Sequence, residues 1–169
     1  MIRYSCVCGS LFLFICVFIF TFSSKSFGEG PGDYISISTA IFDVLQNDIP
    51  SLEGRVEYRF NSAEWPLKPF TGFMANTDGG RYIYAGLFFE ISITDFFSLI
   101  PSFAPGFYIR NFSKDLHSLL EFRSQIEAII ALSKNLKAGF SFNHISNASL
   151  GESNPGVESI ALTVQLPVP

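Results

Sequence analysis

Polar and apolar side chains alternate along two long segments of the chain. Residues 55–60 read Arg-Val-Glu-Tyr-Arg-Phe, and residues 119–132 carry polar side chains at every second position from Glu121 to Glu127. A period of two is typical of β-strands that have one polar and one apolar face. Residues 34–42 and 82–93 show the same alternation more loosely. The pattern therefore predicts an all-β protein.

Eight segments with this character can be counted, separated by turns. The connections alternate between tight turns, at Thr94-Asp95 and Ser133-Lys134, and longer polar loops, at 111–116 and 148–155. Short turns on one side and long loops on the other are typical of outer-membrane barrels, whose tilted strands need about 9–11 residues to cross. We predict an eight-stranded antiparallel transmembrane β-barrel with strands at about 33–45, 53–61, 67–76, 81–93, 96–110, 117–132, 135–147 and 156–166.

In such a barrel the apolar faces point to lipid and the charged side chains point inward. An eight-stranded barrel is just wide enough for side chains to fill, so the interior should be packed and not form a pore. A soluble lipocalin-like barrel with the two faces reversed fits the same alternation and remains an alternative. The charges expected to pair in the lumen are Arg55, Glu57, Arg59, Glu121, Arg123 and Glu127.

Two prolines interrupt the fifth segment, at Pro101 and Pro105. A central strand tolerates proline poorly, because proline cannot donate a hydrogen bond to the neighbouring strand. The register of the strands beside this segment is therefore left open.

The composition and the first 28 residues indicate an exported protein. Charged residues make up 15% of the chain, below the roughly 25% of an ordinary soluble domain, and the net charge of −4 gives no reason to expect a nucleic-acid partner. Arg3, the apolar run 11–22 and the small polar run 23–28 have the layout of a secretory signal peptide. We predict a cleaved signal peptide at 1–28 and a barrel at 29–169, with an uncleaved N-terminal anchor as the alternative.

The cysteines all lie within that first segment, at Cys6, Cys8 and Cys16. The exported domain would then contain none. A disulfide-free domain of this size must be held together by other means, such as a closed sheet in a membrane.

One strand pair places polar groups on an apolar face. In 135–147 the even positions are mostly apolar but include His144 and Ser146, and in 156–166 the apolar even set includes Glu158. Folding the hairpin about Gly151 sets His144 opposite Glu158, with Cβ atoms about 5 Å apart. These three side chains are therefore expected to gather on the lipid-facing wall.

Their chemistry suggests a nucleophile, a base and a carboxylate that orients the base. A strongly polar group facing lipid costs up to about 2–4 kcal/mol at mid-depth and less near the interface, so three of them together favour a functional site. The alternative is that they lie at headgroup level without a catalytic role. With the N-terminus in the periplasm, this hairpin opens at the cell surface, where a hydrolase facing sideways would meet a lipid substrate.

The residues around this cluster resemble a known family. The run Phe142-Asn143-His144-Ile145-Ser146-Asn147-Ala148, followed by Asn154-Pro155-Gly156-Val157-Glu158, is similar to the H-x-S-N…E signature of the outer-membrane lipid A 3-O-deacylases. That family consists of eight-stranded barrels. The resemblance is strongest over 137–162 and upstream only the strand pattern agrees.

The resemblance implies roles for individual residues. Ser146 would be the nucleophile, His144 the general base and Glu158 the orienting acid. Asn147 and Asn154 match asparagines of the family motif and would contribute to an oxyanion hole, with a backbone N–H of the 149–156 loop as a further donor.

It also implies a substrate and a place. The substrate would be lipid A of lipopolysaccharide, which loses the acyl chain esterified at its 3-position, in the outer membrane of a Gram-negative bacterium. No cofactor and no metal is expected, and the other histidine, His117, is interpreted as a strand-end residue. A non-catalytic structural or adhesion barrel is the alternative, and the sequence leaves open whether the barrel forms a homodimer.

Overall fold

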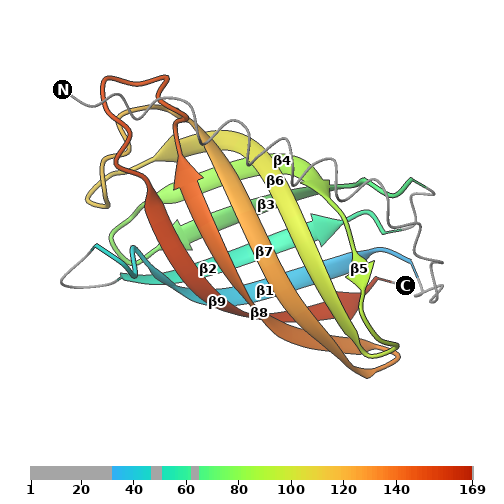
Figure 1. Cartoon of the computed structure of the whole chain (residues 1–169). Helices are drawn as coiled ribbons and strands as arrows, with labels where there is room; N and C mark the ends of the chain where they lie inside the picture. The colour runs from blue at the N-terminus through green and yellow to red at the C-terminus, as the bar shows by residue number, and fades with distance from the viewer. Residues whose placement is uncertain (1–31, 47–50, 62–64, 169) are drawn as a thin grey trace, which may run out of the picture.

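The computed structural model describes residues 32–46, 51–61 and 65–168, and it is a closed, tilted β-barrel (Figure 1). Antiparallel pairing joins each strand to its neighbours, and the order along the sheet is β4-β3-β2-β1-β9-β8-β7-β6-β5. The pairing of β4 with β6 closes the barrel. The strands are β1 (Tyr34–Phe42), β2 (Ser51–Arg59), β3 (Lys68–Asn76), β4 (Arg81–Phe88), β5 (Ile91–Ser92), β6 (Phe97–Ile109), β7 (Leu120–Ser133), β8 (Leu136–Ser146) and β9 (Val157–Pro167).

The nine labelled strands form an eight-stranded barrel, because β4 and β5 are two parts of one interrupted barrel strand. Both pair with β6 in a single register, with Phe88 opposite Ser102 and Ile91 opposite Leu99. The eight predicted segments coincide with these eight barrel strands to within three residues at each end. The predicted eight-stranded antiparallel barrel is confirmed.

The two prolines of β6 explain the irregularities of its neighbour. The carbonyl oxygen of Pro101 accepts a hydrogen bond from the backbone N–H of Phe89 at 3.0 Å, so the proline nitrogen also points toward β4. Pro105 lies four residues later and has the same orientation. The β4–β6 pairing is interrupted opposite both prolines, between Tyr84 and Leu87 and again after Phe88, yet the register continues unchanged.

The apolar side chains point outward. Side chains such as Ile37, Val56 and Phe140 are 49%, 52% and 60% exposed, which suits contact with lipid and not with water. The lumen instead holds the buried charges. The soluble barrel with reversed faces is therefore wrong.

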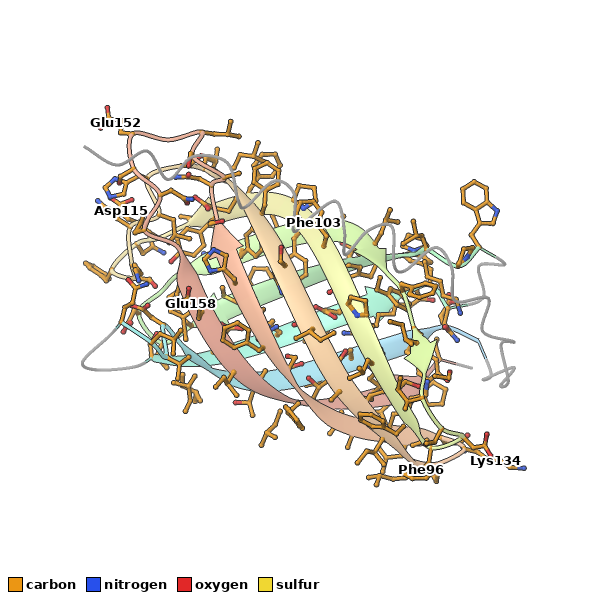
Figure 2. The ribbon with its side chains drawn as sticks, viewed as in Figure 1. Phe96, Phe103, Asp115, Lys134, Glu152 and Glu158 are labelled. Atoms are coloured by element: carbon orange, nitrogen blue, oxygen red, sulfur yellow. The ribbon has the colours of Figure 1, made fainter. Side chains whose placement is uncertain are left out.

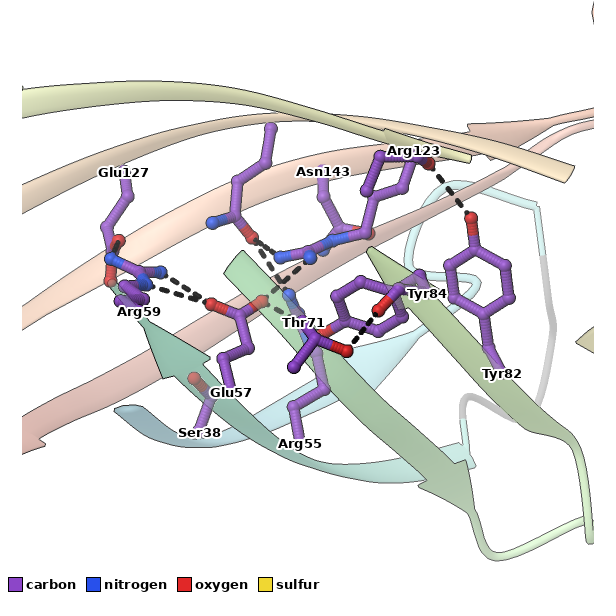
Figure 3. A network of polar contacts seen from close by, with 12 residues as sticks. Ser38, Arg55, Glu57, Arg59, Thr71, Tyr82, Tyr84, Arg123, Glu127 and Asn143 are labelled. Atoms are coloured by element: carbon purple, nitrogen blue, oxygen red, sulfur yellow. Dashed lines mark hydrogen bonds and ion pairs between the residues drawn. The ribbon is translucent and has the colours of Figure 1, made fainter. Parts of the chain in front are cut away.

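Glu57 lies at the centre of the polar network inside the barrel (Figure 3). Its Oε1 accepts a hydrogen bond from Arg123 at 2.7 Å and another from the hydroxyl of Tyr84 at 2.9 Å, while Oε2 accepts one from Arg59 at 2.7 Å. Arg59 also binds Glu127 at 2.7 Å. The network ties β2 to β4 and β7 across the lumen, so the charges stabilise the barrel from within.

Two further contacts extend the network, and one expected pair is missing. Arg55 forms an ion pair with Glu53 and donates to Gln125 at 2.9 Å. Glu121 was expected to pair as well and does lie in the lumen, fully buried, but neither of its carboxylate oxygens has a hydrogen-bond partner among the described residues. The expectation of an ion pair for Glu121 is wrong, because Arg123, two residues along the same strand, directs its guanidinium to Glu57 and Gln125 instead.

Replacing Glu57 with glutamine is expected to destabilise the barrel by about 3–5 kcal/mol, because it leaves Arg59 and Arg123 buried without a full charge partner. Urea unfolding in phospholipid vesicles would measure the loss. Glu152→Gln, a change in an exposed loop, should leave the unfolding midpoint unchanged. Equal midpoints for the two variants would contradict a stabilising role of the lumenal network.

The two ends of the barrel differ (Figure 2). Asp115 and Glu152 lie at one end, which carries the connections 77–80, 110–119 and 147–156 and is called the loop end below. Phe96 and Lys134 lie at the other end, in the connections 93–96 and 134–135. The predicted signal peptide falls in 1–31, outside the described residues, and in the part of the chain that the structure describes no helix is long and apolar enough to span a bilayer.

Candidate active site

The hairpin of β8 and β9 brings the predicted site residues together at the loop end. The two strands pair from Lys137 opposite Gln165 to Ile145 opposite Val157, and His144 lies directly opposite Glu158. The neighbours inward along each strand, Asn143 and Ser159, are buried in the lumen, so His144 and Glu158 point outward. The predicted pairing and the predicted face are confirmed.

The imidazole and the carboxylate are bonded to each other. Nδ1 of His144 lies 2.9 Å from Oε1 of Glu158. The imidazole side chain is 41% exposed and the carboxylate only 13%, so the carboxylate is the more buried partner, and its Oε2 has no hydrogen-bond partner in the described residues. Because Nδ1 is engaged, the other ring nitrogen, Nε2, is left to act on a neighbouring group.

Ser146 follows His144 on the same outward face of β8. Residues two apart on a strand lie about 7 Å apart along it, and the side chain of Ser146 is partly exposed. The outer face of the hairpin thus carries, in this order, the hydroxyl of Ser146, the imidazole of His144 and the carboxylate of Glu158. This is the order that a nucleophile, a base and an orienting acid require.

The β7 side of the site is lined by small and aromatic residues. Ser124 lies opposite His144, and Phe122 lies opposite Ser146. The ring of Phe122 stacks on Phe103 of β6, with centroids 6.0 Å apart and planes 14° apart. In Figure 2, Phe103 of β6 and Glu158 of β9 lie to either side of the strands β7 and β8. The surface next to Ser146 is therefore apolar on one side and carries the carboxylate on the other.

Asn147 directs its polar atoms into the loops. Its side chain is fully buried, and Nδ2 donates to the carbonyl oxygens of Leu116 at 2.8 Å and Ser153 at 2.7 Å. Its Oδ1 accepts from the backbone N–H of Ser149 at 2.8 Å. Both side-chain donors are engaged, so in this arrangement the amide of Asn147 joins the 147–156 loop to the 110–119 loop.

Asn154 lies beside Ser146. Its Oδ1 accepts a hydrogen bond from the backbone N–H of Asn147, the residue after the serine, at 3.1 Å. Its side chain is exposed, and with Oδ1 acting as acceptor, Nδ2 is its donor toward the outside. The side chain of Asn154 is thus tied to the residue that follows Ser146.

The loop between these asparagines has an unusual backbone. Ala148 and Ser149 both adopt left-handed conformations, with φ of 52° and 65°. Such conformations are costly for residues other than glycine and persist where surrounding contacts hold them, often at functional sites. The bonds of Asn147 to Ser149 and Ser153 supply that support.

The 110–119 loop, which sequence reasoning did not include in the site, supports it from the side. A Cβ added at Gly151 would lie 2.5 Å from the carbonyl oxygen of His117, so the two loops are in close contact. The backbone N–H of His117 donates to Asp115 at 2.9 Å, which together with the charge of Arg110 lowers the pKa of the Asp115 carboxyl. Since the supporting groups are mostly backbone carbonyls, no residue pattern could have identified them.

His117 itself lies on the exposed rim of this loop, outside the cluster of Ser146, His144 and Glu158. In the described part of the chain no group of three or more His, Cys, Asp or Glu side chains is placed to hold a metal ion.

Comparisons with solved structures find transmembrane β-barrels of the same fold. The crystal structure of the outer-membrane enzyme PagL superposes with a TM-score of 0.64 at 16% identity, covering 80% of this chain and 99% of PagL. A de novo designed transmembrane β-barrel follows at 0.62, with 9% identity and coverage of 83% and 98%. Neisserial surface protein A gives 0.55, with 8% identity and coverage of 80% and 96%. At these identities the likeness shows the fold alone.

The family comes from the sequence itself. No curated protein sequence matches the chain. Residues 52–167 match the family described as lipid A 3-O-deacylase (PagL), a stretch that includes β2 except for its first residue, all of β3 to β9 and every residue of the candidate site. The chain belongs to the lipid A 3-O-deacylase (PagL) family and is an outer-membrane β-barrel of a Gram-negative bacterium.

Proposed function

We propose that this barrel is a serine esterase that removes the acyl chain esterified at the 3-position of lipid A. The observation that carries the proposal is the hydrogen bond between His144 and Glu158 on the lipid-facing wall, directly beside Ser146. A catalytic group on that wall meets lipid and not solutes of the lumen. Family membership supports lipid A as the substrate.

The reaction would proceed in two stages. Nε2 of His144 takes the proton of Ser146 as Oγ attacks the ester carbonyl carbon, and Glu158 stabilises the imidazolium through Nδ1–H. The tetrahedral intermediate then expels the sugar oxygen, which receives the proton from His144. In the second stage water, activated by the same imidazole, hydrolyses the acyl-serine and releases the fatty acid. All of these side chains come from one chain, so the proposed reaction needs no homodimer.

The substrate would approach from the β7 side. Glu158 occupies the β9 side of the imidazole, whereas Ser124 is small and leaves the surface between His144 and Phe103 open. The stacked rings of Phe103 and Phe122 offer an apolar wall for an acyl chain that runs from the ester at Ser146 toward the membrane interior. The loop end, with the site, would face the cell surface, where lipopolysaccharide lies.

Asn154 is the proposed side-chain donor to the oxyanion, and Asn147 holds it in place through its backbone N–H. The sequence motif suggested both asparagines as donors, but the bonds that engage Nδ2 of Asn147 favour Asn154.

Changing Asn154 to aspartate is expected to lower kcat by about 10²–10³-fold, the usual effect of losing one oxyanion donor. The aspartate still offers an oxygen to Asn147 but has no N–H to donate. Initial rates of fatty-acid release from lipopolysaccharide in detergent would measure the loss. Asn135→Asp, in the turn at the other end of the barrel, is the matched control, and equal rates for the two variants would remove Asn154 from the oxyanion hole.

Mass spectrometry of lipid A tests the function as a whole. Lipid A from cells that express the chain should lose the mass of one 3-position acyl chain relative to cells that carry an empty vector. The same loss should appear when the purified protein acts on isolated lipopolysaccharide. An unchanged lipid A spectrum in both settings would reject the esterase and favour the non-catalytic barrel.

A further inference from the structure

Gly156 lies beside the imidazole of His144 in the hairpin of β8 and β9. It lies just before β9, one step beyond the last β8–β9 pair of Ile145 and Val157, and it therefore faces Ser146 across the mouth of the hairpin. The residue is buried and adopts a left-handed backbone with φ of 65°. A residue with a side chain rarely adopts this conformation.

The backbone of Gly156 packs directly against the ring of His144. A Cβ at this position would lie 2.6 Å from Cε1, 3.3 Å from Nε2 and 3.5 Å from Nδ1. The first of these distances is shorter than any real Cβ contact. Cε1 is the ring atom between the two nitrogens, so Gly156 lies against the edge of the ring between Nδ1, which binds Glu158, and Nε2.

Backbone conformation alone does not explain this glycine. Gly32 and Gly79 also have a positive φ, of 62° and 83°, but a Cβ on either would approach its nearest neighbour no closer than 3.3 Å. Those neighbours, Val168 and Asn111, are not site residues. Among the described glycines with positive φ, Gly156 alone combines the left-handed backbone with a contact too close for a side chain.

We propose that Gly156 is a positioning residue of the esterase: its side-chain-free backbone forms the surface against which the Cε1 edge of His144 rests, and so aims Nε2 at Ser146. This inference rests on the proposed function. Glu158 fixes only Nδ1, and a ring held at one atom can still tilt about that bond. Contact with Gly156 supplies the second support, so any side chain at this position turns Nε2 away from the serine.

Three variants separate ring contact from backbone strain. Gly156→Ala introduces both the strain and the Cβ. Gly156→Asn keeps the Cβ but suits a left-handed backbone far better. Gly79→Ala introduces similar strain at the same end of the barrel, away from the site. Circular dichroism and thermal unfolding of each purified full-length protein establish that the barrel is folded.

Both Gly156 variants should lose activity, whereas Gly79→Ala should keep it. We expect kcat for fatty-acid release from lipopolysaccharide to fall by about 10²-fold, as misplacement of a catalytic group by about 1 Å can cause. KM should change little, because the displaced imidazole acts in the chemical step and not in binding the acyl chain. The rate at which a fluorophosphonate probe labels Ser146 should fall in parallel. Full activity of either Gly156 variant would overturn the proposal, and so would an equal loss in Gly79→Ala.

A measurement on the unmodified protein covers the case in which the variants do not fold. Gly156-Val157 is the only Gly-Val pair in the sequence, so 13C-glycine and 15N-valine labelling isolates the Cα resonance of Gly156. That resonance should differ between the wild-type protein and His144→Gln, because an aromatic ring shifts the resonances of atoms packed against it, and it should change little in Gly79→Ala. A resonance that ignores the imidazole would refute the contact.

The two proposals fail differently. If the wild-type protein leaves lipid A intact, the esterase itself is rejected. If the wild-type protein is active and the folded Gly156 variants are equally active, only the role of Gly156 is rejected.

Discussion

Replacing Ser146 with alanine is expected to abolish release of the acyl chain from lipid A while the barrel remains folded. Removing the nucleophile of a serine hydrolase costs about 10⁶-fold in kcat, since neither the base nor the oxyanion donors can replace the covalent step. Ser146 lies at the edge of the barrel wall and takes no part in the lumenal network, so the change should leave stability nearly untouched. Lipid A from cells that express the variant should give the mass spectrum of the empty-vector control.

Ser124→Ala is the matched control for this experiment. Ser124 is an outward-facing serine opposite His144 on the neighbouring strand, and it could be mistaken for the nucleophile on proximity alone. Its replacement should leave deacylation intact. Complete deacylation by Ser146→Ala, or loss of deacylation only in Ser124→Ala, would show that the nucleophile has been assigned wrongly.

Replacing Glu158 with glutamine should lower kcat by about 10⁴-fold with little change in shape, as happens when the carboxylate of a serine–histidine pair becomes an amide. The carboxylate accepts from Nδ1–H of His144 and so leaves Nε2 free to take the serine proton. A glutamine can turn its NH₂ toward Nδ1, which places the ring proton on Nε2 and blocks it as a base. It also removes the negative charge that stabilises the imidazolium.

Glu158→Asp separates charge from reach in the same assay. Aspartate keeps the charge but is shorter by one methylene, so it should retain more activity than glutamine. A glutamine variant within about tenfold of the wild-type rate would mean that Glu158 only fills space beside the ring, because the loss of a working tautomer should cost far more.

The strands, their two faces and the pairing of the β8–β9 hairpin could all be predicted from the amino-acid sequence. Successive side chains of a strand point to opposite faces. The alternation of Arg55, Glu57 and Arg59 with apolar residues therefore identifies the inner face of this strand. A slip of one residue would have exchanged lipid-facing and lumenal side chains throughout a strand. For the same reason the pairing of His144 with Glu158 could be predicted from the parity of two apolar strands and the position of the loop between them.

Contacts between residues of different strands and loops could be found only in the folded protein. The break between β4 and β5 arises opposite Pro101, on a neighbouring strand, and Glu121 has no ion pair because Arg123 binds Glu57 and Gln125 instead.

At the site, Asn147 is engaged by the backbone carbonyl of Leu116, an acceptor that every residue carries and that therefore leaves no trace in a sequence pattern. Gly156 reads as an ordinary turn glycine until the ring of His144 is found 2.6 Å from the place where its Cβ would stand. The two-residue period shows whether each side chain faces the lipid or the lumen, because the two environments alternate regularly along a strand. Single contacts between loops do not repeat, so only the folded chain reveals them.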